Sequence, residues 1–270
     1  MSERRTLRSV VESFGENCRR VEQLMRFDKV VLDMVLLQLE TLDEKTKNAW
    51  SKALNTKSLK LNPSLDVKRT IEFVQLIRTN ESLKPHYETM INQALVLLVS
   101  YFGSAVRDLF ITAIWHSVDI GANSVVLNAP VKAKVGDIRE MTDPGAFVAD
   151  WLAQGSDLSF QDMKSIGRAF EHYFGVSIDR TERENDIVLG QACRHSIVHA
   201  GGVVDDQLLR QLRGSSPRTV KPELKRNESL RFAEDEVQTI AVAMQSYLGD
   251  VGTSLRNVLK AESQSVDPVP

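Results

Sequence analysis

Apolar residues recur at steps of three and four along three long stretches of this chain, and that spacing limits the folds open to it. The first stretch covers residues 4–40, the second reaches from Pro85 to about Ile120, and the third runs from Glu234 to about Ala261. Such spacing gathers apolar side chains on one face of an α-helix, so each stretch predicts an amphipathic helix. Strand signals are almost absent. The chain is therefore predicted to be all-α, a helical bundle with long loops.

Local signals predict the shorter elements. Gly15 is a point at which the first stretch bends or divides, and a short helix at Glu44–Leu54 precedes a linker. Ser159 is the expected N-cap of a helix that Gly175 ends. The remaining expectations are short helices at Val67–Ile77, Phe147–Leu152 and Asp205–Leu212, an irregular connection over 121–145, and a short extended piece at Glu228–Phe232.

The expected helices divide the chain into three parts. Residues 1–60 are predicted to form an N-terminal helical extension, residues 67–262 a helical bundle, and residues 263–270 a flexible tail. The most apolar run, Ala94–Val99 with flanks to Val106, is interrupted by serine and glycine and is too short for a bilayer span. We therefore expect a buried core helix there and no membrane among the partners.

Composition argues for a cytoplasmic protein. The net charge of −2 gives no global attraction to nucleic acid, so any such contact must come from a local basic patch. Cys18 and Cys193 lie far apart, which indicates neither a disulfide framework nor a zinc cluster and suits a reducing compartment. The charged N-terminus lacks the apolar segment of a signal peptide.

The stretch Ala192–Asp205, A-C-R-H-S-I-V-H-A-G-G-V-V-D, carries the chemistry that stands out. It puts Arg194, His195 and His199 near the end of an otherwise apolar helix, which Asp179 or Thr181 begins and two glycines stop. The histidines, four residues apart, share a face, whereas Arg194 projects about 140° from His199 on an ideal helix. A long arginine side chain can still bring its guanidinium near the imidazole. Because His199 sits in the last turn, the helix dipole favours its imidazolium form.

The phrase Arg-His-Ser-Ile-Val-His-Ala-Gly-Gly resembles the HEPN superfamily, whose nucleases carry Arg, a polar residue, three to five further residues and then His. It is most similar to the large prokaryotic groups of the RiboL-PSP-HEPN kind, in which a helix ends in Val-His followed by Asn or Ala and glycines. The resemblance covers about residues 85–260. It implies a HEPN-type bundle and RNA cleavage without a metal or other cofactor, in which the ribose 2′-hydroxyl attacks the adjacent phosphorus and leaves a 2′,3′-cyclic phosphate.

The resemblance also implies roles and partners. His199 would be the general acid/base, Arg194 would hold the phosphate, and His195 would orient the site or transfer a second proton. Family members usually dimerise with this helix at the two-fold axis, which implies a homodimer whose motif copies share one cleft. The family often serves in phage defence or as the toxin of a toxin–antitoxin pair. RNA and an antitoxin or other regulatory protein are thus the expected partners.

A basic segment follows the motif between Arg210 and Arg231 and contains few acidic residues. Arg210, Arg213, Arg218 and Lys221 are candidates for contact with the RNA backbone. The segment has no aromatic residues on which bases could stack, so it predicts no sequence preference. A solvated loop is the alternative interpretation.

Other interpretations of the motif stay open. Arg194 and His199 are also explained as a structural pair that satisfies carbonyls at a helix end. His195 and His199 have the spacing of two zinc ligands, although the glutamate of the metalloprotease arrangement is missing. Cys193 is expected to be a small buried residue, because six residues on a helix do not align it with His199.

A second function from another class is a HEPN-like helical module that binds nucleotide, RNA or protein without catalysis. A third is an interaction protein in which the motif is only structural. Ser104 and Arg107 on the second long helix could face the cleft.

Overall fold

The computed structural model describes residues 5–53, 63–78, 80–134, 136, 141–154, 158–178 and 180–265. Over these ranges the chain is helical, with no strand and a single β-bridge between Val203 and Ser229. The helices are α1 (Leu7–Ala53), α2 (Pro63–Arg78), the 3-10 turn η2 (Glu81–Leu83), α3 (Lys84–Ile120), α4 (Ser124–Leu127), α6 (Pro144–Gln154), α7 (Met163–Phe174), α8 (Glu182–His199), α9 (Asp206–Gln211) and α10 (Glu234–Ser265). The all-α prediction is confirmed.

The chain divides into two compact units. The first unit joins Met1–Val21 to Ile91–Pro270, and the second unit is Glu22–Met90. Helix α1 runs through both units, and so does α3. The units therefore differ in their limits from the segments 1–60 and 67–262 expected from the sequence.

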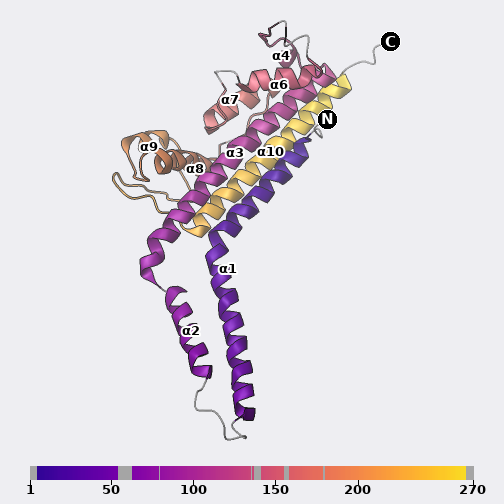
Figure 1. The fold of residues 1–270 in the computed structure, drawn as a ribbon. Helices are drawn as coiled ribbons and strands as arrows, with labels where there is room; N and C mark the ends of the chain where they lie inside the picture. Colours follow the sequence, from indigo (N-terminus) through magenta and orange to yellow (C-terminus); the bar gives the residue numbers. More distant parts are fainter. Residues whose placement is uncertain are drawn as a thin grey trace. The chain divides into compact units, whose positions relative to one another are not determined.

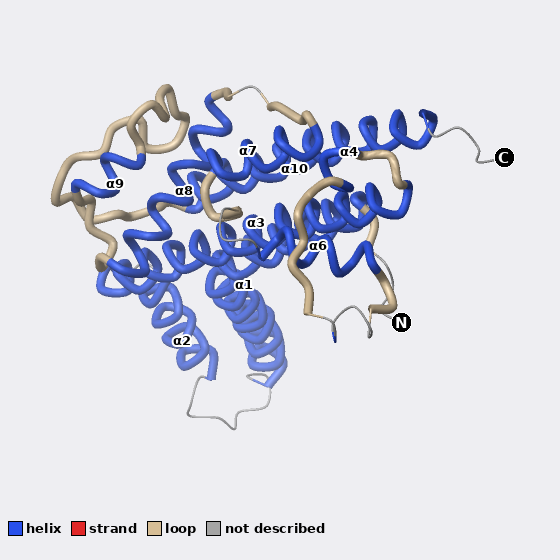
Figure 2. Tube along the Cα trace, turned by 90° about the horizontal axis from the view of Figure 1, so that it is seen from above, coloured by secondary structure: helices blue, strands red, loops and turns tan. Residues whose placement is uncertain are grey.

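The core of the first unit is built on the start of α1 together with α3 and α10, whose long helices run side by side (Figures 1 and 2). The Phe102 ring of α3 meets Phe14 of α1 and Tyr247 of α10, with ring centroids 6.0 Å apart in both pairs. Gly252 of α10 allows a close approach, because a Cβ there would lie 3.3 Å from Val11 Cγ2. These contacts bury large apolar groups, which is the main stabilising term of such a bundle.

Helix α7 packs on α3 through one aromatic cluster. Phe110 of α3 is fully buried. Ring centroids of Phe160, Phe170, Tyr173 and Phe174 lie 5.3, 5.9, 5.4 and 6.0 Å from that of Phe110. These ring contacts hold α7 against α3.

The start of α7 differs from the prediction. Asp162, not Ser159, is the N-cap, and its carboxylate accepts the Ser165 N–H at 2.8 Å. The Ser159 hydroxyl instead accepts the Gln161 N–H at 3.2 Å and shapes the turn before the helix. The predicted end is confirmed, because Gly175 takes a left-handed φ of 64° that favours glycine.

Helix α1 is continuous where the sequence suggested a bend at Gly15 and a break before Glu44–Leu54. Helix-forming residues bridge that break, and the Lys47 ammonium lies 2.5 Å from the Asp43 carboxylate one turn earlier. Helix α10 also runs on to Ser265, past the start of the predicted tail. Residues 266–270 and Asp179 lie outside the described residues.

One described helix, α3, is long and apolar enough to cross a membrane, with a mean hydropathy of 1.7 in its best window. Half of that window is buried inside the protein. The core helix of a soluble protein passes the same test, so length and hydropathy do not distinguish the two. The expected core run is buried, with Ala94, Leu95 and Leu98 fully inaccessible.

Candidate functional site

Helix α8 carries the motif and starts with a capping box. The Thr181 side chain accepts a backbone N–H of the first turn, and the Glu184 carboxylate reaches back to the Thr181 N–H at 2.6 Å. Thr181, one of the two expected caps, is thus the N-cap. Two donors at the helix start are satisfied, which holds this end of α8 in place.

Two further polar residues in the first turns of α8 are buried and form hydrogen bonds to the loop after α9. Asp186, 2% exposed, accepts the backbone N–H groups of Thr219 and Val220 at 3.0 and 2.9 Å. The Asn185 amide donates to the Pro217 carbonyl at 2.9 Å. Buried carboxylates are stable only with such partners, so these bonds explain why polar groups stand on a core helix.

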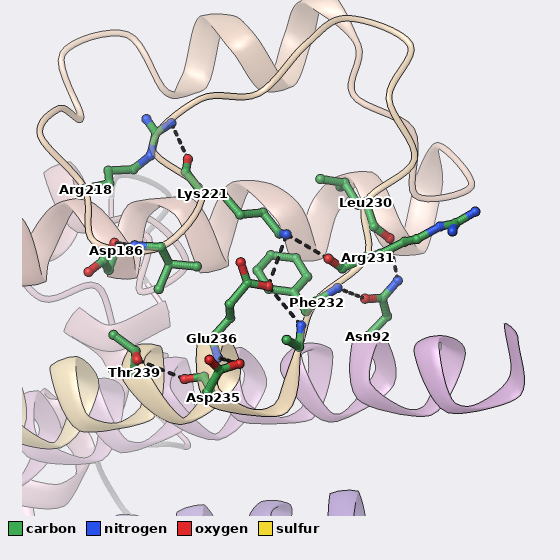
Figure 3. Close-up of polar contacts among 12 residues, drawn as sticks. Asn92, Asp186, Arg218, Lys221, Leu230, Arg231, Phe232, Asp235, Glu236 and Thr239 are labelled. Atoms are coloured by element: carbon green, nitrogen blue, oxygen red, sulfur yellow. Dashed lines mark hydrogen bonds and ion pairs between the residues drawn. The ribbon is translucent and has the colours of Figure 1, made fainter. Parts of the chain in front are cut away.

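The same loop is tied to α3 and α10 by a second set of contacts (Figure 3). The Lys221 ammonium donates to the Arg231 carbonyl at 2.7 Å and lies 3.1 Å from the Glu236 carboxylate. Asn92 of α3 donates to the Leu230 carbonyl at 2.8 Å. The loop is therefore held to three helices by specific hydrogen bonds.

The end of α8 turns sharply. Gly201 and Gly202 have left-handed φ values of 64° and 70°, which a glycine adopts without strain. The Ser196 carbonyl accepts the N–H groups of Ala200 and Gly202, and its buried hydroxyl donates to the Val203 carbonyl at 2.7 Å. The predicted glycine stop is confirmed, and it leaves Val198 49% exposed beside His199.

Arg194 lies between two cavities. The first cavity, about 850 Å³, is bounded by α7, α8, α10, residues 176–178, Arg180, and residues between Gln211 and Ser215. The second cavity, about 480 Å³, lies between α3, the segment 158–161 and α8. Arg194, Gln161 and Gln191 line both. The Arg194 Nε is buried without a hydrogen-bond partner among the described residues.

The two motif histidines are exposed, and their rings are in contact in a tilted arrangement. Their ring centroids lie 4.9 Å apart, with the ring planes tilted by 49°. The Gln207 amide nitrogen lies 3.2 Å from His195 Nε2. His195 also lines the first cavity, whereas His199 lines neither.

The first cavity carries mixed charge. Two of its acidic residues already accept hydrogen bonds at helix starts: Asp162 caps α7, and Glu184 belongs to the capping box of α8. Arg168 and Arg180 bond to neighbouring side chains, Arg168 to Ser165 and Arg180 to Asn185 and Ser215. The charged or titratable lining residues are Asp162, Lys164, Arg168, Glu171, Arg180, Glu184, Arg194, His195 and Arg213.

The basic segment divides into two groups. Arg210 and Arg213 are exposed, and Arg213 lines the first cavity. The Arg218 guanidinium donates to the carbonyls of Ser215, Lys221 and Pro222 at 2.9 to 3.0 Å. Lys221 is occupied by the loop contacts of Figure 3. Arg218 and Lys221 therefore hold the loop, and of the four candidate cations Arg210 and Arg213 are the two that face solvent.

The Cys193 side chain is fully buried, as the helical spacing predicted. Burial raises the pKa of its thiol to about 12. Across the described ranges, no cluster of three or more His, Cys, Asp or Glu side chains could hold a metal. The zinc spacing of His195 and His199 thus has no third ligand within those ranges.

The sequence named some residues of the second cavity and missed others. Ser104 and Arg107, suggested to face a cleft, line it together with Arg194. Gln161 and Gln191 were missed because a single amide gives no pattern along the chain. Their signal is spatial: both stand beside Arg194 where three segments meet.

No family model, no curated protein and no solved structure matches this chain.

Proposed function

We propose that this chain is a HEPN-type endoribonuclease that cleaves RNA without a metal. The ribose 2′-oxygen forms a bond to the adjacent phosphorus while the bond to the 5′-oxygen breaks. One group removes the 2′-hydroxyl proton and another protonates the leaving 5′-oxygen. The products are a 2′,3′-cyclic phosphate and a 5′-hydroxyl end.

One observation carries the proposal: the Arg194 guanidinium, without a hydrogen bond at Nε, lines the same cavity as the exposed His195, whose ring contacts that of His199. Arg194 holds the phosphate and offsets charge on its oxygens. His199 transfers the proton, and His195 orients it or transfers the second. Among the hydrogen bonds of the described residues, none joins the side chain of Arg194, His195 or His199 to a backbone carbonyl.

A homodimer through α8 completes the proposed site. The exposed side chains of Val198 and His199 at the end of α8 offer a surface on which two motif copies can meet. The partner's histidine then stands across the scissile phosphate from the first copy's arginine. Phage defence, or toxicity held in check by an antitoxin, is the cytoplasmic role we propose for such an enzyme.

A specific observation also favours a second candidate, a module that binds nucleotide or RNA without cleaving it. His199 lines neither cavity that Arg194 lines, so one copy of the chain offers phosphate binding without His199 in the same cavity. This candidate keeps the role of Arg194 and drops that of His199.

The experiment incubates purified protein with mixed RNA in EDTA, beside Arg194→Ala and His199→Ala. Matched controls are Arg8→Ala and His172→Ala, because both residues are exposed and outside the site. Cleavage by the parent and both controls, with none by the two motif variants, supports the nuclease. RNA binding without cleavage by the parent supports the second candidate. Loss of thermal stability in both motif variants, with no RNA effect in the parent, overturns both.

A further inference from the structure

The second cavity has the lining of an anion site. Its polar lining residues are Ser100, Ser104, Arg107, Ser159, Gln161, Gln191 and Arg194, which include two guanidinium groups and no carboxylate. A volume of about 480 Å³ lies in the range of small-ligand pockets, roughly 300–1,000 Å³. The cavity thus combines positive charge with hydroxyl and amide groups in a space of ligand size.

The cations of this cavity are poorly compensated by the protein itself. The Arg194 Nε is buried with no hydrogen bond, although a buried guanidinium nitrogen ordinarily has an acceptor. Arg107 has a carboxylate 3.8 Å away, that of Asp150, and the two side chains are 40% and 60% exposed. Such a long, solvated ion pair is weak and can be displaced by a better anion.

One neutral lining residue, Gln191, has a donor available, whereas the Ser100 and Ser104 hydroxyls donate to the carbonyls of Val96 and Ser100. Gln191 Oε1 accepts the Met163 N–H at 3.1 Å, which fixes the amide and leaves its NH₂ group as a donor. Gly103 brings α3 close to the opposite wall, since a Cβ there would lie 3.2 Å from the Phe160 carbonyl. At Gly103 the wall of the cavity is therefore formed by tight backbone packing.

We infer that the second cavity binds a phosphate group, with Arg107 and Arg194 as its charged ligands and Gln191 as a neutral donor. The inference deepens the proposed function and rests on it for the polynucleotide. Arg194 stands between this phosphate position and the first cavity, so the second cavity takes a phosphate neighbouring the one at the histidines. The ligand's phosphate comes either from within an RNA strand or from a terminal or free phosphate.

The test measures binding and needs no cleavage. Inorganic phosphate, and a short 2′-O-methyl RNA with either a 5′-phosphate or a 5′-hydroxyl, are titrated into the full chain by calorimetry. We expect Arg107→Ala to weaken phosphate binding about ten-fold or more, since charge-assisted hydrogen bonds are lost. Asp150→Asn should strengthen it, because the competing carboxylate is gone. Arg8→Ala, which removes the same charge elsewhere, should change nothing.

The titrations with the two RNAs and with free phosphate distinguish an internal phosphodiester from a terminal phosphate. Preference for the 5′-phosphorylated RNA, with competition by free phosphate, supports a terminal-phosphate site. Equal binding of both RNAs with the same loss in Arg107→Ala supports an internal phosphodiester. Absence of phosphate and RNA binding, or an equal loss in Arg8→Ala, overturns the inference. Phosphate binding by a protein that cleaves no RNA would uphold this site and refute the nuclease.

In the second unit, α1 exposes an apolar stripe. Its members fall into four pairs seven residues apart: Leu24 and Val31, Phe27 and Met34, Val30 and Leu37, and Val35 and Leu42, each between 38% and 64% exposed. Three described residues of the same stretch are buried: Met25, Leu36 and Asp43. Met25 and Asp43 are each nine residues from Met34, and Leu36 is nine residues from Phe27. Nine residues place two side chains on opposite sides of a helix. The stripe therefore lies opposite the buried face.

The geometry points to the same stripe of a second copy as its occupant. A seven-residue apolar repeat is the pattern by which helices pair as coiled coils, and it is complementary to itself. Eight such side chains expose on the order of 700 Å² per chain, near the ~800 Å² per partner of a stable interface. This interface does not use the motif residues, and it is an alternative to the homodimer through α8 that the proposed nuclease uses.

Light scattering on the full chain tests this interface. The double variant Phe27→Glu/Met34→Glu should be monomeric, and Val242→Glu, which charges a lone apolar residue 62% exposed on α10, should remain dimeric like the parent. Val198→Glu reports on a dimer formed through α8. A monomeric parent, or a double variant that stays dimeric, overturns the proposal. Dissociation by Val198→Glu alone assigns the dimer to α8 and also overturns it.

Discussion

The rings of His195 and His199 lie 4.9 Å apart, one turn from each other, at the exposed end of α8. The two are not equivalent, because His195 lines the first cavity and touches Gln207, whereas His199 does neither. Their contact lets one ring orient the other. In the proposed nuclease it would also let two imidazoles transfer protons side by side, which their spacing of four residues suggested.

The roles proposed for the two histidines predict different losses in RNA cleavage. His199→Ala should lower the single-turnover rate about 100-fold or more, the usual contribution of a general acid or base. His195→Ala should lower it only about ten-fold, because it removes an orienting contact. Rapid-quench measurements on a labelled RNA check both values. The reverse order would move the main proton transfer to His195.

The long helices could be predicted from the sequence because their apolar period is local information. Helix α3 begins and ends close to the expected residues, and α10 begins where expected but runs on to Ser265. Helix α1 was divided wrongly, because a polar composition around Asp43 resembles a linker while its i,i+4 ion pair favours a helix. Composition cannot separate these two cases without knowing what the helix contacts.

The site was predictable only in part, for the same reason. Arg194 and its histidines belong to one helix, so spacing placed them together. The second cavity joins Arg107, Gln161 and Gln191 from three segments that no sequence period relates. Asp186 is a further example, because its partners, Thr219 and Val220, lie in a loop more than thirty residues later.

The buried carboxylate of Asp186 predicts a large stability effect. Asp186→Ala leaves two backbone N–H groups unsatisfied inside the protein, at a cost of about 1–3 kcal/mol each. We expect the free energy of unfolding to fall by about 2–5 kcal/mol in urea titrations. Asp206→Ala is the control, because its carboxylate is about half exposed and pairs with Arg226 at the surface. A loss in Asp206→Ala as large as in Asp186→Ala would contradict the assigned role.

Two glycines in helices predict opposite effects of alanine. A Cβ on Gly145 of α6 would lie 2.8 Å from Trp115 Cδ1 and 3.3 Å from the Trp115 carbonyl. Gly145→Ala should therefore destabilise the first unit by roughly 1–3 kcal/mol, as overpacking does. A Cβ on Gly249 of α10 would meet nothing within 4 Å. Gly249→Ala should stabilise by about 0.5–1 kcal/mol through helix propensity. Thermal unfolding of the two variants checks the signs.

The buried thiols predict resistance to alkylation. Burial raises the pKa of Cys18 to about 11 and that of Cys193 to about 12, from an ordinary value of 9.0. Only the thiolate reacts, so both cysteines should resist iodoacetamide at pH 8 in the folded protein and react fully in urea. Mass spectrometry of the alkylated chain counts the labels. Rapid labelling of Cys193 in the native state would contradict its burial beside the motif.

The same raised pKa values predict a loss of stability in alkali. In the unfolded chain each thiol loses its proton near pH 9, whereas in the folded chain it keeps the proton to about pH 11 at Cys18 and about 12 at Cys193. The unfolded state then binds fewer protons, so stability falls as pH rises. Each contribution is complete below pH 9 and is lost progressively toward the folded value. Urea midpoints between pH 8 and pH 11 measure the decline, and Cys193→Ala should make it shallower although that variant is less stable at pH 8. An unchanged slope would show that Cys193 ionises equally in both states.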